Sequence, residues 1–131
     1  MHATWRRSRT RLLVFVAVLA TAGGIAAGVA STASAATCPS TYACGWIDSN
    51  FGSNRGQWAG NNAHFSVFGQ PNCQEGNWND CISSDANEGT QCTVHFWTDA
   101  SFQGTRHNVA RGSFEGGLGS LNDTFSSNNW C

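Results

Sequence analysis

Two copies of one short pattern decide the fold of this chain. They are Gly76-Asn77-Trp78-Asn79-Asp80-Cys81-Ile82-Ser83-Ser84 and Gly119-Ser120-Leu121-Asn122-Asp123-Thr124-Phe125-Ser126-Ser127. Five of the nine positions are identical, and two more are apolar in both copies. Because a repeat defines the architecture before any single motif does, the pattern indicates a duplicated unit.

A second repeated pattern lies upstream of each copy and supports the duplication. It pairs Trp46-Ile47-Asp48-Ser49-Asn50-Phe51 with Trp97-Thr98-Asp99-Ala100-Ser101-Phe102. Trp46 precedes Asn79 by 33 positions, whereas Trp97 precedes Asn122 by 25, so the first unit carries 8 extra residues. We expect this insertion to contain the loop around Cys73.

The segments around these repeated patterns are short and rich in Trp, Phe, Val and Thr, with Gly, Asn and Ser between them. This pattern predicts strands separated by turns, without helices. The expected strands are 42–48, 56–59, 64–68, 93–98, 105–110 and 124–128. Apolar and polar residues alternate only partly along these strands, which favours a sandwich in which one face of each sheet is buried.

The repeated Asn-Asp-x-x-Ser-Ser run suggests a cation site. Calcium prefers six to eight oxygen ligands from carboxylates, amides, hydroxyls and backbone carbonyls, and this run supplies several within one turn. The apolar residue inside each run, Ile82 or Phe125, can anchor the turn in the core. The simpler interpretation is that Asn, Asp and Ser only form turns, but the recurrence of the whole run favours the metal site.

These two patterns resemble the motifs of the microbial βγ-crystallins. In that family an aromatic-x-x-x-x-aromatic-x-Gly hairpin is followed by an Asn/Asp-Asn/Asp-x-x-Ser/Thr-Ser calcium loop. Trp97, Phe102 and Gly104 match the hairpin, whereas Ser53 takes the glycine position in the first unit, where we expect a distorted hairpin. The resemblance implies an all-β, βγ-crystallin-like double Greek key β-sandwich with units at about 38–90 and 91–131.

The same resemblance implies up to two weak calcium sites, one in each loop. The implied ligands are Asp80, Ser83 and the Cys81 carbonyl in one site, and Asp123, Ser126 and the Thr124 carbonyl in the other, with a carbonyl from the partner unit's hairpin. Asn79 and Asn122 are further candidates. One carboxylate per loop predicts a Kd on the order of 10⁻⁵ to 10⁻³ M.

The opening run 38–46 and the hairpin 99–106 are similar to a secreted bacterial peptidase inhibitor family with this fold, which includes metalloproteinase inhibitors. The resemblance implies an inhibitor with a secreted peptidase as its partner. A rigid exposed loop is what an inhibitor needs, and the segment from Phe68 to Asn79 is the candidate. No reactive-loop motif assigns its inhibitory residues.

The N-terminus has the layout of a cleaved secretory signal peptide. Four arginines precede an apolar run, and Ala33-Ser34-Ala35 suits cleavage before Ala36. The alternative is a retained membrane anchor, since the run approaches the roughly 20 residues that span a bilayer. We expect residues 1–35 to be removed and 36–131 to be a secreted, monomeric single domain without stable membrane insertion.

The part from Ala36 onward has three arginines, eight acidic residues and no lysine. A surface that tracks nucleic-acid phosphates needs clustered cations, so we expect no nucleic-acid partner.

All six cysteines lie in the exported part, and an even count there favours three disulfides. The sequence leaves the pairing open; proximity along the chain favours Cys38–Cys44, and the last residue, Cys131, could join Cys92, which leaves Cys73 for Cys81. Zinc is the competing use of cysteine and histidine. Neither C-x-x-C nor H-x-x-x-H spacing is present, so we expect no zinc motif.

Three other functions compete with inhibition. The first alternative is an enzyme, but the sequence contains neither a Gly-x-Ser-x-Gly nucleophile elbow nor a paired catalytic motif that would indicate one. A glycan-binding, cell-wall-binding or antimicrobial module would use exposed tryptophans; Trp46 and Trp97 are expected in the core, whereas Trp58 and Trp130 are freer to bind. The third alternative is a purely structural calcium-stabilised protein.

Overall fold

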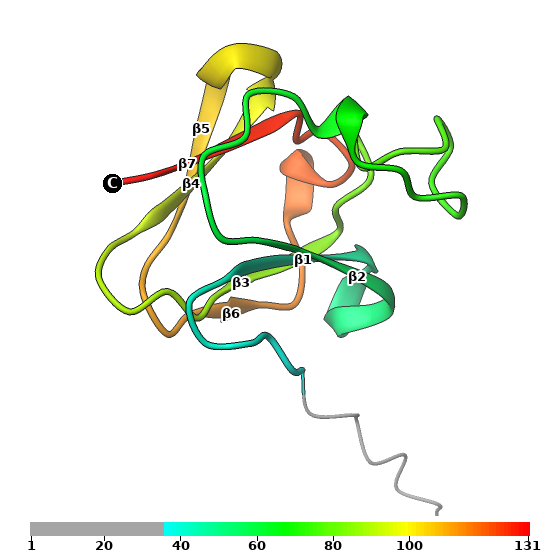
Figure 1. Ribbon diagram of the computed structural model, residues 1–131. Coiled ribbons are helices and arrows are strands. Elements are labelled where there is room, and N and C mark those ends of the chain that lie inside the picture. The colour runs from blue at the N-terminus through cyan, green and yellow to red at the C-terminus, as the bar shows by residue number, and fades with distance from the viewer. Residues whose placement is uncertain (1–35) are drawn as a thin grey trace, which may run out of the picture. The chain divides into compact units, whose positions relative to one another are not determined.

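Short strands separated by Asn-, Gly- and Ser-rich turns form two antiparallel sheets (Figure 1). The computed structural model describes residues 36–131, so the predicted signal peptide lies outside the described residues. One sheet has the order β2-β1-β3-β6 and the other β5-β4-β7. The strands are β1 (Ala43–Asp48), β2 (Gly52–Trp58), β3 (Ser84–Asn87), β4 (Val94–Asp99), β5 (Gln103–Val109), β6 (Phe114–Glu115) and β7 (Ser127–Trp130).

The two halves of the chain repeat the same arrangement. In each half a hairpin, β1–β2 or β4–β5, is closed by a 3-10 turn, η1 (Ser49–Phe51) or η3 (Ala100–Phe102), and the first strand pairs on its other side with β3 or β7. Strand β6 comes from the second half but pairs with β3 of the first. One strand of the second half therefore completes the sheet of the first half.

The core lies between the sheets and is mainly aromatic. Phe96 stacks on Phe125 with ring centroids 5.3 Å apart, and Trp58 stacks on Phe65 at 4.6 Å. Ile82 and Phe125, the apolar residues inside the repeated runs, are fully buried, so their predicted role as anchors is confirmed.

Several predicted strand boundaries are wrong. Residues 64–68 form the 3-10 turn η2 (Phe65–Val67), because Phe68 donates its N–H to the Phe65 carbonyl and no neighbouring strand pairs with the segment. The strand expected at 124–128 begins at Ser127. Strands β3 and β6 were not predicted; β3 reads Ser-Asp-Ala-Asn and is completely buried, so it lacks the apolar alternation that marks a strand.

The first hairpin is not distorted, contrary to the expectation from Ser53. Its register shift between Trp46 and Asp48 matches the shift between Trp97 and Asp99. Ser53 adopts φ +62°, the left-handed conformation that Gly104 adopts at φ +80°. The backbone is therefore kept, and Ser53 carries the strain of a side chain in a region that favours glycine.

Three disulfides join all the cysteines of the described residues. The pairs are Cys38–Cys44, Cys73–Cys81 and Cys92–Cys131, the set that chain proximity favoured. The first ties the N-terminal segment to β1 and the last ties the C-terminus to the segment before β4. Within residues 36–131 no helix is long and apolar enough to cross a membrane.

The ion pairs found in residues 36–131 both involve His107 of β5. Its Nε2 lies 3.1 Å from Asp85 Oδ2 on β3 and 3.2 Å from Glu115 Oε2 on β6. Contact with the Asp85 carboxylate raises the pKa of His107 above its ordinary 6.5 despite partial burial. Burial raises the pKa of Asp85 above its ordinary 3.8.

Two glycine exchanges test the hairpin strain. Ser53→Gly should raise the free energy of unfolding by up to about 1 kcal/mol, because relief of the left-handed backbone exceeds the added freedom of the unfolded chain. Gly104→Ala should lower it by about 1–3 kcal/mol, since the new Cβ would also meet the Thr98 hydroxyl and the Asp99 carboxylate. Urea unfolding measures both, and a destabilising Ser53→Gly would contradict the strain.

The raised pKa of His107 predicts a pH dependence of stability. The folded state binds the ring proton more tightly than the unfolded state, so the contribution is complete below pH 6.5 and disappears as pH rises through the higher folded value. The melting temperature should therefore fall as the pH rises above about 6.5. Melts in a chelator-containing buffer would measure this, and an equal slope in His107→Gln would contradict it.

Candidate functional site

The two Asn-Asp-x-x-Ser-Ser loops lie against each other and are joined by reciprocal backbone hydrogen bonds. The Asp80 N–H donates to the Phe125 carbonyl at 3.0 Å, and the Asp123 N–H donates to the Ile82 carbonyl at 2.9 Å. Both aspartates have left-handed backbones, with φ +51° and +54°. Each loop therefore uses the anchor residue of the other as its hydrogen-bond acceptor.

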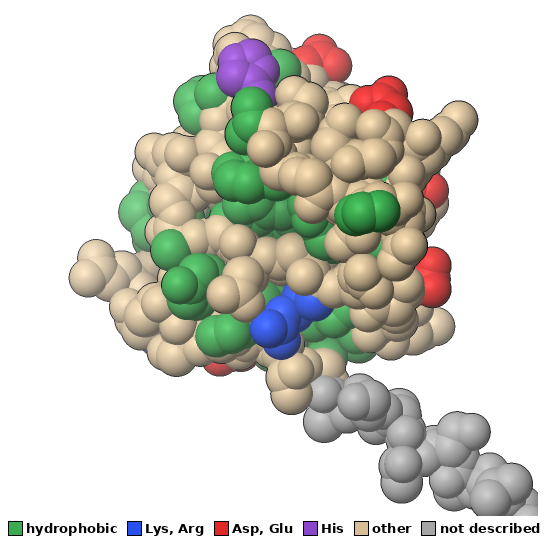
Figure 2. Space-filling view, turned by 45° about the vertical axis from the view of Figure 1, so that its right-hand side comes forward, with side chains coloured by type: hydrophobic (Ala, Val, Ile, Leu, Met, Phe, Trp, Pro, Cys, Tyr) green, Lys and Arg blue, Asp and Glu red, His purple; other side chains and the backbone are tan. Residues whose placement is uncertain are grey.

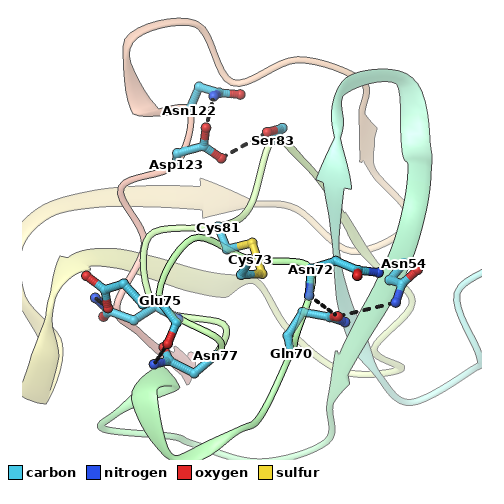
Figure 3. Close-up of a disulfide and its surroundings, with 11 residues drawn as sticks. Asn54, Gln70, Asn72, Cys73, Glu75, Asn77, Cys81, Ser83, Asn122 and Asp123 are labelled. Carbon is cyan, nitrogen blue, oxygen red and sulfur yellow. Dashed lines mark hydrogen bonds between the residues drawn. A yellow bond between two sulfur atoms is a disulfide. The ribbon is translucent and has the colours of Figure 1, made fainter.

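Side-chain oxygens also meet across the loops. The Ser83 hydroxyl donates to Asp123 Oδ1 at 3.0 Å (Figure 3). The Ser126 hydroxyl lies 3.4 Å from Asp80 Oδ1 and 2.9 Å from the Thr98 carbonyl of the second hairpin. The structure thus regroups the predicted oxygens: Asp80 belongs with Ser126, and Asp123 with Ser83. A prediction that treats each loop separately could not foresee this grouping, because the grouping follows from the antiparallel crossing of the two loops.

The paired asparagines hold the aspartates. Asn79 donates its side-chain amide to Asp80 Oδ2 at 3.0 Å, and Asn122 does the same to Asp123 Oδ2 at 2.7 Å. In each loop one carboxylate oxygen is held by the neighbouring asparagine while the other faces the serine of the opposite loop. The two asparagines therefore act as positioning residues in this structure.

Cys81 and Thr124 occupy equivalent positions after the aspartates. Cys81 is buried in its disulfide and lines a cleft of about 400 Å³ beside the first loop. The Thr124 hydroxyl donates to the Leu121 carbonyl at 2.7 Å, which closes the second loop.

The cleft beside the first loop concentrates negative charge. Its lining includes the carboxylates of Asp48, Glu75, Asp80 and Asp123 and no arginine or histidine. Partial burial, and next the Glu75 carboxylate, raise the pKa of Asp80 above its ordinary 3.8. On the face shown in Figure 2 most of the visible acidic side chains lie along the upper and right-hand edge. This cleft has the charge and the oxygen donors that suit a hard cation.

Glu75 is a site residue that the sequence analysis missed. Its carboxylate accepts the Asn79 amide at 3.2 Å, so Asn79 joins Glu75 to Asp80. Glu75 is the single acidic residue between Phe68 and Asn79, a signal that could have singled it out.

The insertion forms a closed, braced loop that projects from the sandwich (Figure 1). Gly69 and Asn77 pair at its base. Inside it the Gln70 N–H donates to the Gly76 carbonyl at 2.9 Å, and the buried Gln70 side chain accepts from Asn54 and from the Asn72 N–H (Figure 3). The Cys73–Cys81 disulfide joins this braced loop to the first Asn-Asp-x-x-Ser-Ser loop.

The tryptophans do not follow the expected division. Trp58 is buried in the core at 4% exposure, so the expectation that it is free to bind a ligand is wrong. Trp97, expected in the core, is half-buried beneath the Arg106 guanidinium. Trp46 is buried as predicted, and Trp130 is half-buried beside a cleft of about 240 Å³.

Comparison with family models matches residues 31–110 to the model described as peptidase inhibitor family I36. The matched residues are more than half of the chain. A search of curated proteins returns no match.

Solved structures with a similar fold are βγ-crystallins. One, from work on the evolution of the eye-lens βγ-crystallin domain fold, is 21% identical with a TM-score of 0.60 over 72% of this chain and 90% of that one. A βγ-crystallin from Ciona intestinalis is 20% identical with a TM-score of 0.57, over 69% and 99%. An archaeal βγ-crystallin is 17% identical with a TM-score of 0.54, over 71% and 100%. The chain therefore has the βγ-crystallin fold.

Proposed function

The chain belongs to peptidase inhibitor family I36, and from this premise we propose that it is a secreted, calcium-stabilised inhibitor of a metallopeptidase. It is a non-enzymatic, peptidase-inhibitor-like protein with the βγ-crystallin fold. The observation that carries the proposal is the braced loop formed by residues 69–77. We call this segment the inhibitory loop.

An inhibitor binds tightly when its contact loop loses little entropy on docking. The inhibitory loop meets this requirement because three kinds of contact already restrain it: the pairing of Gly69 with Asn77, the hydrogen bonds of Gln70, and the Cys73–Cys81 disulfide. Trp78, buried at 5% exposure, anchors its C-terminal end in the core.

The surface around the inhibitory loop has the composition of a contact site. Pro71, Asn72, Gln74 and Glu75 are exposed. Val67, just before the loop, is 72% exposed, the highest value among large apolar side chains of the described residues. An apolar contact surrounded by a polar rim is the usual anatomy of a protein interface. We assign Val67 to the apolar contact and the loop to the polar contacts with the peptidase.

The two crossed loops would bind calcium and so stabilise the base of the inhibitory loop. In this proposal Asp80, Ser126 and the Thr98 carbonyl contribute to one site, and Asp123 with Ser83 contributes to the other. The all-oxygen donor set and the absence of a lining arginine in the first cleft support calcium. Cys81 shares its disulfide with the inhibitory loop, so calcium at the first loop would also restrain the inhibitory loop.

We also propose that the protein is exported and begins at Ala36 after signal cleavage. The three disulfides support this, because such bonds form and persist in oxidising compartments.

The number of calcium ions bound distinguishes crossed sites from single-loop sites. With crossed sites, Asp80→Ala/Ser126→Ala should remove one site and leave the other intact, whereas Asp80→Ala/Ser83→Ala should remove both. Single-loop sites predict the reverse. Isothermal titration of the oxidised protein measures the stoichiometry, and no heat with the unmodified protein at millimolar calcium would contradict calcium binding itself.

Inhibition of a thermolysin-like metallopeptidase tests the proposed activity. The oxidised protein in saturating calcium should inhibit near one-to-one. Cys73→Ser/Cys81→Ser should weaken inhibition at least about tenfold because the loop loses its preorganisation.

The matched control is Cys38→Ser/Cys44→Ser, which removes a disulfide of similar loop length at the entry to β1. It should inhibit like the unmodified protein when both are assayed well below their melting temperatures. No inhibition of metallo-, serine or cysteine peptidases by the unmodified protein would contradict the proposed function.

A further inference from the structure

Three potential metal ligands from three strands meet away from the crossed loops. They are Asp85 of β3, His107 of β5 and Glu115 of β6, and one ligand atom of each lies within 4.8 Å of the others. His107 Nε2 is 3.1 Å from Asp85 Oδ2 and 3.2 Å from Glu115 Oε2. Because β3 and β6 belong to one sheet and β5 to the other, this cluster joins the two sheets.

Asp85 is fully buried, yet neither of its carboxylate oxygens has a hydrogen-bond donor in line with it. His107 Nε2 is likewise close to both carboxylates without being aligned with either for a hydrogen bond. A buried charge is strongly unfavourable unless it is both paired and hydrogen-bonded, and Asp85 is paired with His107 without an aligned hydrogen bond. The ligand atoms of Asp85, His107 and Glu115 therefore lie around one point in space. Their lone pairs are not used in aligned hydrogen bonds.

Within residues 36–131 no arginine or lysine balances the two carboxylates of the cluster, and a protonated His107 supplies at most one positive charge. Asp85 and Glu115 face each other directly across the β3–β6 pair, an arrangement in which like charges repel. The three arginines of the described residues make other contacts: Arg55 with Thr37, Arg111 with the Thr90 carbonyl, and Arg106 with the Trp97 ring. The chain has no lysine beyond residue 35. With the His107 imidazole in the neutral form that binds metals, the two carboxylates carry the charge that one divalent cation would neutralise.

The duplicated fold provides an internal comparison. The register of the two halves makes Asn128 the counterpart of Asp85, and Gly56 the counterpart of His107. Asn128 is also fully buried but is satisfied, since its Oδ1 accepts from Asn62 and its Nδ2 donates to the Gly60 carbonyl. The fold thus accommodates a neutral residue at this position, so it does not itself require the buried charge of Asp85.

We propose that Asp85, His107 and Glu115 bind one divalent transition-metal ion, with zinc as the best match. A nitrogen ligand excludes calcium as the preferred ion and suits zinc. Zinc bond lengths of about 2.0–2.2 Å place neighbouring tetrahedral ligands roughly 3.3–3.6 Å apart, so the 3.1 and 3.2 Å observed would lengthen by a few tenths of an ångström on binding. His107 Nε2 and the Asp85 oxygens are buried, but the Glu115 side chain is 35% exposed, so its movement would admit the ion and a water as the fourth ligand.

The site does not depend on the proposed inhibitory function, but it lies beneath the crossed loops. Asp85 follows Ser84, the last residue of the first loop, and the His107 ring stacks on Phe125 of the second loop at 5.4 Å. A bound ion would fix both sheets directly under these loops.

Zinc titration of the exported, oxidised protein in millimolar calcium tests the proposal. Calorimetry should give one equivalent of zinc and a higher melting temperature. In NMR spectra of the unmodified protein, zinc should shift the ring resonances of His107 and leave those of His64 and His95 unchanged. Absence of binding at millimolar zinc, or shifts confined to His64 and His95, would overturn the assignment.

Two variants copy the other half of the molecule and should fold. Asp85→Asn and His107→Gly should each weaken zinc binding more than about tenfold and remove its effect on the melting temperature. The matched control, His64→Gln/His95→Gln, should bind zinc like the unmodified protein. Unchanged zinc affinity in His107→Gly, or lost affinity in the control, would contradict the site.

Discussion

The reciprocal hydrogen bonds between the two repeated loops are the interaction on which the rest of this structure depends. The amides of Asp80 and Asp123 each bond the carbonyl of the other loop's buried anchor, Phe125 or Ile82. This arrangement seals the end of the sandwich where the anchors enter the core, and it brings each aspartate to the opposite serine. Each loop needs the other to complete its hydrogen bonds, so we expect the two halves to form one cooperative unit.

Much of this structure could be predicted from the sequence, because many of its features depend on residues close together in the chain. The repeat identified the loops and their anchors, and chain proximity favoured the disulfide pairs. The crossed grouping of Asp80 with Ser126 could not be predicted from the sequence, because it depends on how the two halves of the chain pack together. Strand β3 was missed because its buried residues are polar, and Ser53 was misjudged because the hairpin register overrides its backbone preference.

The cluster of Asp85, His107 and Glu115 was hidden for the same reason. Its members are far apart in the sequence and lack ligand spacing, so only the Greek key exchange of β6 between the halves brings them together. Its counterpart, Asn128 with Gly56, keeps the fold without charge. Duplication thus supplied a symmetric frame, and the halves then diverged: the first gained the braced loop beside Glu75, and the junction gained a candidate metal site.

Native-state hydrogen exchange of the Asp80 and Asp123 amides tests the central claim most directly. If the loops are one reciprocal unit, both amides exchange as slowly as those of the central strand β4, and Ile82→Ala accelerates both together. Fast exchange at one loop while the other stays protected would show that the loops are independent, and would contradict this account of the fold.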